Sequence, residues 1–247
     1  MVQDKVIVIT GASAGIGAAL AEQLGREGAS LVLVARREDA LKDTASRSGA
    51  RVLTVVADVT VRDDVRRVVK DAIKRFGHID VWVNNAGQGI TRQPSELTDE
   101  DIDLMIRVNV KSVLYGTQEV LPHFKERGAG HVINLSSELG RIPYAVHRSA
   151  YSGAKHFMNA LTANFRDEVQ LTHPGIQFSI VSPGIVRTEF GVRARHGGPD
   201  SRQFAQAQTA EEAAAVIADV IVSRKRDAYT RPDAHQRVVD YYAGLLR

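Results

Sequence analysis

Short runs of β-branched residues alternate along the chain with longer stretches of helical periodicity, and this alternation restricts the possible folds most. Strands that are apolar on both faces and alternate with helices are typical of a parallel sheet covered on both sides. Because crossovers between parallel strands are right-handed, the pattern predicts a doubly wound α/β sheet. The strand-like runs lie at residues 5–10, 30–35, 51–57, 79–83, 131–135 and 176–181. The helical stretches between them include residues 18–26, 65–76, 102–124 and 154–171.

We expect one domain over residues 1–247, since neither a linker-like stretch nor an internal repeat interrupts this pattern. Residues 187–208 are the exception, being polar, glycine-containing and weakly periodic. A segment of this length between two elements is typical of a functional flap, and we predict a substrate lid there. An alanine-rich helix at about 209–223 and a short strand at 228–230 then complete a sheet of about seven strands.

The composition argues against several classes of protein. The chain has no cysteine, which excludes disulfides and thiolate catalysis, and its eight histidines show no metal-ligand spacing, so no metal site is expected. A formal charge of +3 from dispersed basic residues does not favour a nucleic-acid partner. No apolar run approaches the ~18 residues that cross a bilayer, so no membrane partner is expected. The N-terminus enters a strand without a secretory signal, and we expect a cytoplasmic location.

The stretch TGASAGIG, residues 10–17, joins the first strand to the first helix. Gly11, Gly15 and Gly17 remove side chains where a turn must approach a pyrophosphate, and Ser13 offers a hydroxyl. The helix N-terminus that follows provides unpaired N–H groups for a phosphate. A tight turn between strand and helix would also use these glycines, but the position favours nucleotide binding.

The second strand ends in Ala35, Arg36 and Arg37, about twenty residues after the glycine turn. A dinucleotide fold places its ribose-reading group there, and a carboxylate at that point would repel a 2′-phosphate. Ala35 removes this repulsion, and guanidinium groups suit phosphate oxygens. The alternative is two solvated arginines at a strand end. We predict NADP over NAD, with Arg37 either sharing the phosphate or stacking on adenine.

Tyr151 and Lys155 lie four residues apart at the start of a predicted helix, so they share one face. A phenol has a pKa of about 10, and a nearby ammonium group favours the phenolate, which makes Tyr151 a workable acid or base. Ser136 and Ser137 end the fifth strand, where a parallel sheet opens its ligand crevice. A serine hydroxyl there can bind a carbonyl oxygen.

These motifs together resemble the short-chain dehydrogenase/reductase family, which has a Rossmann-like fold. The resemblance extends over about residues 4–190 and rests on TGASAGIG at 10–17, NNAG at 84–87 and YSGAK at 151–155. It implies that Tyr151 donates a proton to a carbonyl and that Ser137 polarises this carbonyl. It also implies that Lys155 lowers the Tyr151 pKa and holds the nicotinamide ribose, and that Asn109 organises a proton relay.

The resemblance implies contacts to the cofactor as well. Asp58 and Val59 would contact adenine, residues 85–87 would line the ribose, and the turn after the sixth strand would hold the carboxamide. Asp58 capping the next helix, Asn84 and Asn85 forming a turn, and Asn109 making a structural hydrogen bond remain alternatives. The expected cofactor-binding residues are Gly11, Ser13, Gly15, Ile16, Gly17, Arg36, Arg37, Asp58, Val59, Asn85, Ala86, Gly87, Tyr151, Lys155, Pro183, Gly184, Val186 and Thr188.

The chain departs from the family pattern at three places, and one of them is residues 187–208, which resemble the family's substrate lid only in their position. Ser137 precedes Tyr151 by fourteen residues, one more than is usual, so Ser136 remains an alternative catalytic serine. The usual C-terminal strand sequence is replaced by residues 227–247. A homodimer or homotetramer is expected from the family, and Tyr241 and Tyr242 pack either on a neighbouring subunit or on their own domain.

The sequence thus predicts an NADP-dependent oxidoreductase that interconverts a carbonyl and an alcohol on a small molecule. A nucleotide-sensing or scaffold protein without turnover is the alternative from another class. The sensor or scaffold alternative is less favoured because Asn109, Ser137, Tyr151 and Lys155 are all present together. An epimerase or dehydratase would need a longer substrate domain after Pro183. The sequence does not indicate which carbonyl or alcohol binds.

Overall fold

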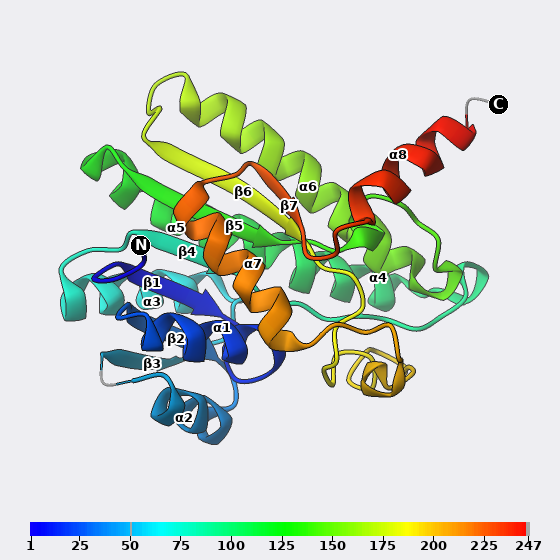
Figure 1. Cartoon of the computed structure of the whole chain (residues 1–247), viewed down its shortest axis with the longest axis horizontal. Coiled ribbons are helices and arrows are strands. Elements are labelled where there is room, and N and C mark those ends of the chain that lie inside the picture. Colours follow the sequence, from blue (N-terminus) through cyan, green and yellow to red (C-terminus); the bar gives the residue numbers. More distant parts are fainter. Residues whose placement is uncertain (50, 246–247) are drawn as a thin grey trace.

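The computed structural model describes residues 1–49 and 51–245, and its centre is a parallel sheet of seven strands (Figure 1). The strand order is β3-β2-β1-β4-β5-β6-β7, which confirms the predicted doubly wound sheet. The order reverses between β1 and β4, and a crevice at such a point holds the ligand in open α/β folds. The strands are β1 (Val6–Thr10), β2 (Ser30–Ala35), β3 (Val52–Val56), β4 (Val81–Asn84), β5 (Gly130–Leu135), β6 (Ile176–Ser182) and β7 (Asp227–Tyr229).

Helices cover both faces of this sheet and divide the core into two layers. One layer packs α1 (Gly15–Arg26), α2 (Glu38–Arg47) and α7 (Ala210–Ser223) against the strands, and α1 and α7 lie in front of the sheet in Figure 1. The other layer packs α3 (Arg62–Phe76), α5 (Ser112–Arg127) and α6 (Ser149–Gln170). All residues of β1, β2, β5 and β6 are buried, which explains the largely apolar sequences of β1 and β2. Each fully buried Val, Ile or Leu side chain contributes about 1.5–3 kcal/mol to the free energy of folding, relative to an exposed side chain.

The stretch expected as one helix at 102–124 is three elements. It comprises α4 (Asp99–Ile106), a π-helical turn at Arg107–Lys111 and α5. Thr98 and Asp101 form a capping box that starts α4 before the apolar period begins. A π-helical turn differs from an α-helix in its hydrogen-bond pattern, i→i+5 in place of i→i+4, and the spacing of apolar residues did not indicate this change.

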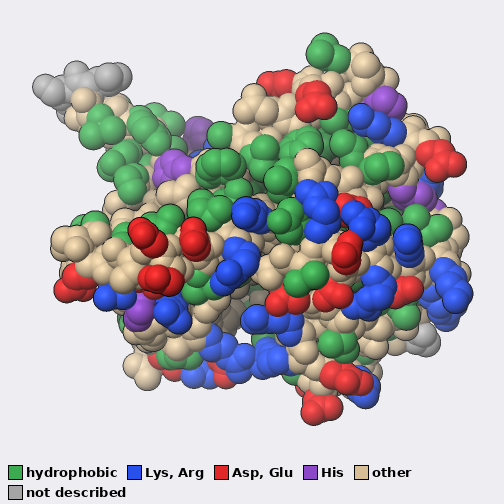
Figure 2. All heavy atoms as spheres, turned by 180° about the vertical axis from the view of Figure 1, so that it is seen from behind, with side chains coloured by type: hydrophobic (Ala, Val, Ile, Leu, Met, Phe, Trp, Pro, Cys, Tyr) green, Lys and Arg blue, Asp and Glu red, His purple; other side chains and the backbone are tan. Residues whose placement is uncertain are grey.

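Helices α2 and α8 (Ala234–Leu245) lie outside the predicted helical stretches. Only Leu41 and Thr44 of α2 are buried, so its sequence shows little apolar period. Helix α8 projects from the body near the C-terminal end of the sheet (Figure 1), and Figure 2 shows apolar side chains along it. Its contacts to the body include a hydrogen bond from the Tyr242 hydroxyl to the Arg141 carbonyl (2.7 Å). Tyr242 therefore packs at least partly on its own domain.

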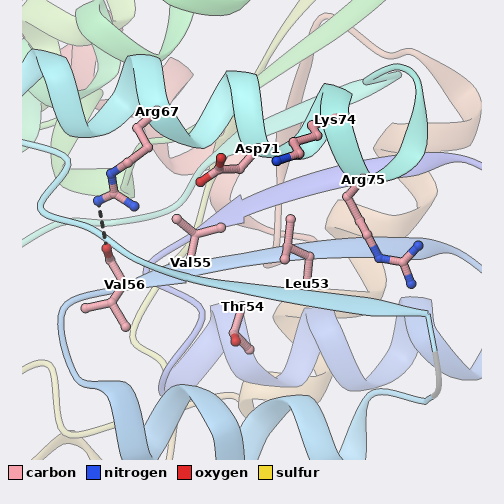
Figure 3. Close-up of a pocket in the computed structure, with 8 residues that line it drawn as sticks. All are labelled: Leu53, Thr54, Val55, Val56, Arg67, Asp71, Lys74 and Arg75. Carbon is pink, nitrogen blue, oxygen red and sulfur yellow. Dashed lines mark hydrogen bonds between the residues drawn. The ribbon is translucent and has the colours of Figure 1, made fainter.

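A hollow lies at the opposite edge of the sheet, between β3 and α3 (Figure 3). Arg67 closes one end by donating from Nη2 to the Val56 carbonyl (2.9 Å). Asp71, Lys74 and Arg75 follow along α3 above the apolar side chains of β3 (Figure 3). It lies along the edge strand, away from the strand order reversal where a ligand is expected.

Candidate active site

A cleft of about 580 Å³ opens along the C-terminal ends of the strands. It is the place where the predicted site residues meet. Of these residues, only Gly17 and Asn109 do not line it. The lining residues from the predicted set are Gly11, Ser13, Gly15, Ile16, Arg36, Arg37, Asp58, Val59, Asn85, Ala86, Gly87, Ser137, Tyr151, Lys155, Pro183, Gly184, Val186 and Thr188.

The glycine turn at one end of the cleft has the geometry of an anion site. Gly11 and Gly15 have positive φ angles of 68° and 56°, which disfavour other residues. A Cβ atom at Gly17 would lie 2.5 Å from both Asn85 Nδ2 and the Gly11 carbonyl oxygen, so Gly17 serves the packing of the turn. Among the described residues, no side chain caps the start of α1, and its first turn has no acidic residue. Its N–H groups are therefore available to a phosphate.

The Asn84 and Asn85 side chains are used within the protein. Asn85 Nδ2 donates to the Thr10 carbonyl (2.8 Å), which fixes the β4 end against the glycine turn. Asn84 is buried and donates to Asn134 Oδ1 (2.8 Å). Asn85 still contributes to the cleft wall together with Ala86 and Gly87.

Arg36 and Arg37 flank the cleft next to the glycine turn. Arg37 Nη2 donates to the Ser13 hydroxyl (3.2 Å), and Arg36 Nη1 lies 3.9 Å from Asp58 Oδ2. The Arg36 side chain is 76% exposed and is free to turn toward a ligand. Asp58 does not cap α3, whose N-cap is Val61, because its Oδ1 accepts from Thr60 within a local turn.

Tyr151 and Lys155 lie on α6 with their side chains almost fully buried, at 7% and 3% exposure. Lys155 Nζ donates to the Leu135 carbonyl (2.6 Å) and lies 5.7 Å from the Tyr151 ring centroid. Burial raises the pKa of Tyr151 to about 12, against the opposing effects of the Ser137 hydroxyl and the Arg148 charge. Burial also lowers the pKa of Lys155 to about 8. A tyrosine held neutral beside a lysine that titrates near neutrality suits proton exchange.

The two serines after β5 have different surroundings. Ser137 accepts a hydrogen bond from the Leu139 amide (3.1 Å) and lies close enough to Tyr151 to lower the pKa of its phenol. Ser136 is buried near Gly140, with no hydrogen-bond partner for its hydroxyl among the described residues. Both line the cleft, but only Ser137 affects Tyr151. This difference favours Ser137.

Asn109 lies in the π-helical turn and is fully buried. Its Nδ2 donates to the Gln88 carbonyl (2.9 Å) and its Oδ1 accepts from the Gln88 amide (3.2 Å). The side chain thus holds the segment after β4, and a Cβ atom at Gly87 would lie 3.1 Å from Asn109 Oδ1. The structural hydrogen bond that the sequence left open is present. The relay role stays a prediction.

Residues 187–208 form one wall of the cleft, and their contacts to the body include the following. Arg195 pairs with the segment after β4, donating to the Gly89 carbonyl (2.9 Å) and accepting from the Thr91 amide (3.0 Å). Asp101 on α4, fully buried, accepts from His196 (2.8 Å) and pairs with Arg195 (3.4 Å) and Arg92 (3.0 Å). Burial raises the pKa of Asp101, but hydrogen bonds from His196, the Thr98 amide and Arg92 outweigh it and lower the pKa to about 2.

Asp101→Asn should destabilise the protein by about 3 kcal/mol, because Arg92 and Arg195 lose a buried anion and His196 loses a charged hydrogen-bond partner. Urea unfolding measures this loss, and hydrogen exchange should increase within residues 187–208 more than in β5 or β6. Asp103→Asn, on the exposed side of α4, is the matched control and should change the free energy of unfolding by less than about 0.5 kcal/mol. Equal effects of the two substitutions would contradict this role for Asp101.

Lys155 should make the stability of the cofactor-free protein rise with pH. Its pKa is about 8 when folded, against 10.5 when unfolded, so the unfolded chain binds more protons between these values. The free energy of unfolding should therefore gain about 2 kcal/mol from pH 7 to 9.5 through this group. Urea unfolding of wild type and Lys155→Met at both pH values isolates this gain. A variant that gains as much as wild type would rule out Lys155 as the cause.

Sequence reasoning did not single out Asp101, Phe190 or Arg148 for the site. Asp101 is 95 residues from His196 in sequence, and no periodic signal links them. Arg148 does have a signal, because it precedes Tyr151 by three residues and so lies on the same side of the helix start. Tyr144 and His147 are exposed and also line the cleft.

The part of the chain that the structure describes shows no group of three His, Cys, Asp or Glu side chains suited to a metal ion. In the same residues, no helix has both the length and the apolar character to cross a membrane.

Comparison with known proteins adds independent findings. A family model described as short chain dehydrogenase matches residues 5–197. An uncharacterized oxidoreductase of Staphylococcus epidermidis is 38% identical over 200 residues, which cover 78% of this chain and 86% of that protein. A short chain dehydrogenase/reductase of Burkholderia phymatum, solved with NAD, has a TM-score of 0.89 at 26% identity, covering 100% of this chain and 96% of that one. An alcohol dehydrogenase of Thermococcus sibiricus, solved with 5-hydroxy-NADP, has a TM-score of 0.78 at 30% identity, covering 92% and 95%.

Proposed function

The chain belongs to the short-chain dehydrogenase/reductase family, and on this premise we propose that it is an NADP-dependent enzyme that reduces a carbonyl to an alcohol or catalyses the reverse. Hydride transfer between a nicotinamide cofactor and a small molecule is the chemistry that this family supports. The proposal also names NADP as the cofactor and gives each catalytic residue a role. One observation supports both points: Tyr151, Lys155 and Ser137 line the same cleft as the glycine turn and Arg36.

The residues present fit a nicotinamide dinucleotide. The turn at Gly11–Gly15 offers open N–H groups to a pyrophosphate, and no carboxylate follows Ala35 to repel a 2′-phosphate. Arg36 and Arg37 would hold that phosphate, and Lys155 would hold the nicotinamide ribose. Similar folds have been solved with NAD and with 5-hydroxy-NADP, so the choice of NADP rests on these arginines.

Tyr151 has the role of acid in carbonyl reduction. Its buried phenol stays protonated well above neutral pH, which keeps a proton ready for the developing alkoxide. Ser137 donates a hydrogen bond to the carbonyl oxygen, and Lys155 stabilises the phenolate that remains after proton transfer. The bound cofactor supplies the hydride, while the protein supplies orientation and the proton. Asn109 positions the segment after β4 and links Lys155 to solvent through the proposed relay.

A turnover assay tests this function. Purified protein is incubated with NADPH and a panel of aldehydes, ketones and oxo acids, and loss of absorbance at the nicotinamide band is followed. We expect reduction of at least one carbonyl, with NADH less effective than NADPH. A protein that binds NADPH but reduces none of these compounds, and oxidises none of the matching alcohols with NADP⁺, would instead support the sensor or scaffold alternative.

A further inference from the structure

Arg148 lies in the wall of the cleft, and the described residues provide no acidic partner for its charge. It is the N-cap residue of α6 and precedes Tyr151 by three residues. Its Nη1 atom is buried without a hydrogen-bond partner, and among the described residues no acidic side chain lies within 4.0 Å of its guanidinium group. Burial lowers the pKa of this guanidinium. A buried charge without a counterion is unfavourable, and it commonly marks a ligand that supplies one.

The other arginines on this side of the cleft are neutralised. Arg193 pairs with Glu189 (2.5 Å), Arg202 with Asp200 (2.8 Å) and Arg195 with Asp101 (3.4 Å). Glu189 and Asp200 are the acidic residues of the segment 187–208, and both are paired in this way. On the substrate side of the cleft, Arg148 is therefore the lining arginine that has no carboxylate partner among the described residues, as Arg37 is at the cofactor end.

Two glycines make room for the Arg148 guanidinium group. A Cβ atom at Gly89 would lie 2.7 Å from Nη1, and a Cβ atom at Gly198 would lie 2.8 Å from Nη2. The same point at Gly198 is 2.8 Å from the Thr91 hydroxyl oxygen, which is also buried without a partner among the described residues. Arg148 lines the cleft whereas Thr91 and Gly198 do not, so the guanidinium group alone offers a ligand in the cleft a fork of two donors that matches the two oxygens of a carboxylate.

The Arg148 guanidinium group lies close to the reacting position. Phe190 packs edge-on against the Tyr151 ring, with centroids 5.6 Å apart. The same phenyl ring reaches within 3.0 Å of the Cβ position of Gly89, beside Arg148 Nη1. One aromatic ring therefore packs against the proposed acid and lies near the unpaired cation. A substrate that reaches both groups needs only a short chain between its carbonyl and its anionic group.

We propose that Arg148 binds a carboxylate of the substrate, so that the substrates are short oxo acids and the corresponding hydroxy acids. This inference rests on the proposed function, because it concerns the same cleft. Arg148 acts here as a specificity-determining residue that orients the carbonyl toward Tyr151.

The test compares each oxo acid with its methyl ester in the NADPH assay, using 4-oxopentanoate and 2-oxobutanoate as the acids. Wild type should prefer the acid, and Arg148→Met should reduce the acid-to-ester ratio of kcat/KM about 100-fold, mainly through a higher KM for the acid. Arg148→Lys should restore part of this preference. Arg193→Met, which removes an arginine already paired with Glu189, is the matched control and should leave the ratio within about threefold.

A binding measurement gives a second readout that does not need turnover. Oxamate, a carboxylate that is not reduced, should raise the Tm of the NADP⁺ complex of wild type but not that of the Arg148→Met complex. Esters reduced as well as acids by wild type, or an unchanged ratio in Arg148→Met, would overturn the carboxylate site alone. Reduction of no carbonyl at all would overturn the proposed function, and the inference with it.

Discussion

Tyr151→Phe should lower kcat for carbonyl reduction by about 10³-fold or more while leaving NADPH binding within about threefold of wild type. The substitution removes only the hydroxyl oxygen from a side chain that is 7% exposed, so the ring still packs against Phe190. Without that oxygen the alkoxide has no protein acid beside it. Steady-state kinetics and a fluorescence titration with NADPH measure the two quantities on one preparation.

Tyr144→Phe is the matched control for this experiment. Tyr144 also lines the cleft but is 53% exposed, and its substitution should change kcat by less than about threefold. Full activity of Tyr151→Phe toward any accepted substrate would show that another group supplies the proton.

Arg36→Asp should shift the ratio of kcat/KM for NADPH to that for NADH by about 100-fold or more toward NADH. The carboxylate would repel a 2′-phosphate and accept hydrogen bonds from a 2′-hydroxyl. It would also lie near Asp58, whose carboxylate faces Arg36 at 3.9 Å in the native protein. The ratio is read from initial rates with both cofactors and one carbonyl substrate.

Arg75→Asp makes the same charge change on α3, in the hollow at the β3 edge (Figure 3), and should leave the cofactor ratio unchanged. If Arg36→Asp also leaves it unchanged, Arg36 does not select the cofactor. A shift confined to Arg37→Ala would move that role to Arg37, which is hydrogen-bonded to Ser13.

The sequence predicted the sheet and most of the cleft because local signals specify both. Fully apolar strands identify a sheet buried on both faces, and residues that follow the strands meet at one edge by topology. Tyr151 and Lys155 are one helical turn apart, so their proximity is also a local property. For this reason the glycine turn, Arg36 and Tyr151 lie in one cleft as expected.

The features that the sequence did not predict depend on contacts between distant segments. The Asp101 and His196 pair joins α4 to a segment without periodicity, and the Arg148 environment depends on Gly89 and Gly198, which belong to different loops. The π-helical turn around Asn109 depends on its bonds to Gln88. Helix α8 buries only Ala234 among its residues, so its sequence has no apolar periodicity that predicts a helix.

Transfer of a deuterium label tests the central assignment most directly. The protein is incubated with an accepted carbonyl and with NADPH labelled at C4 of the nicotinamide, in separate reactions for each face of the ring. Mass spectrometry should find one deuterium on the carbinol carbon of the product with one labelled face, and none with the other, at a rate that Tyr151→Phe abolishes. An alcohol without deuterium from either reaction, or labelled product formed as fast by Tyr151→Phe, would contradict direct hydride transfer with Tyr151 as the proton donor.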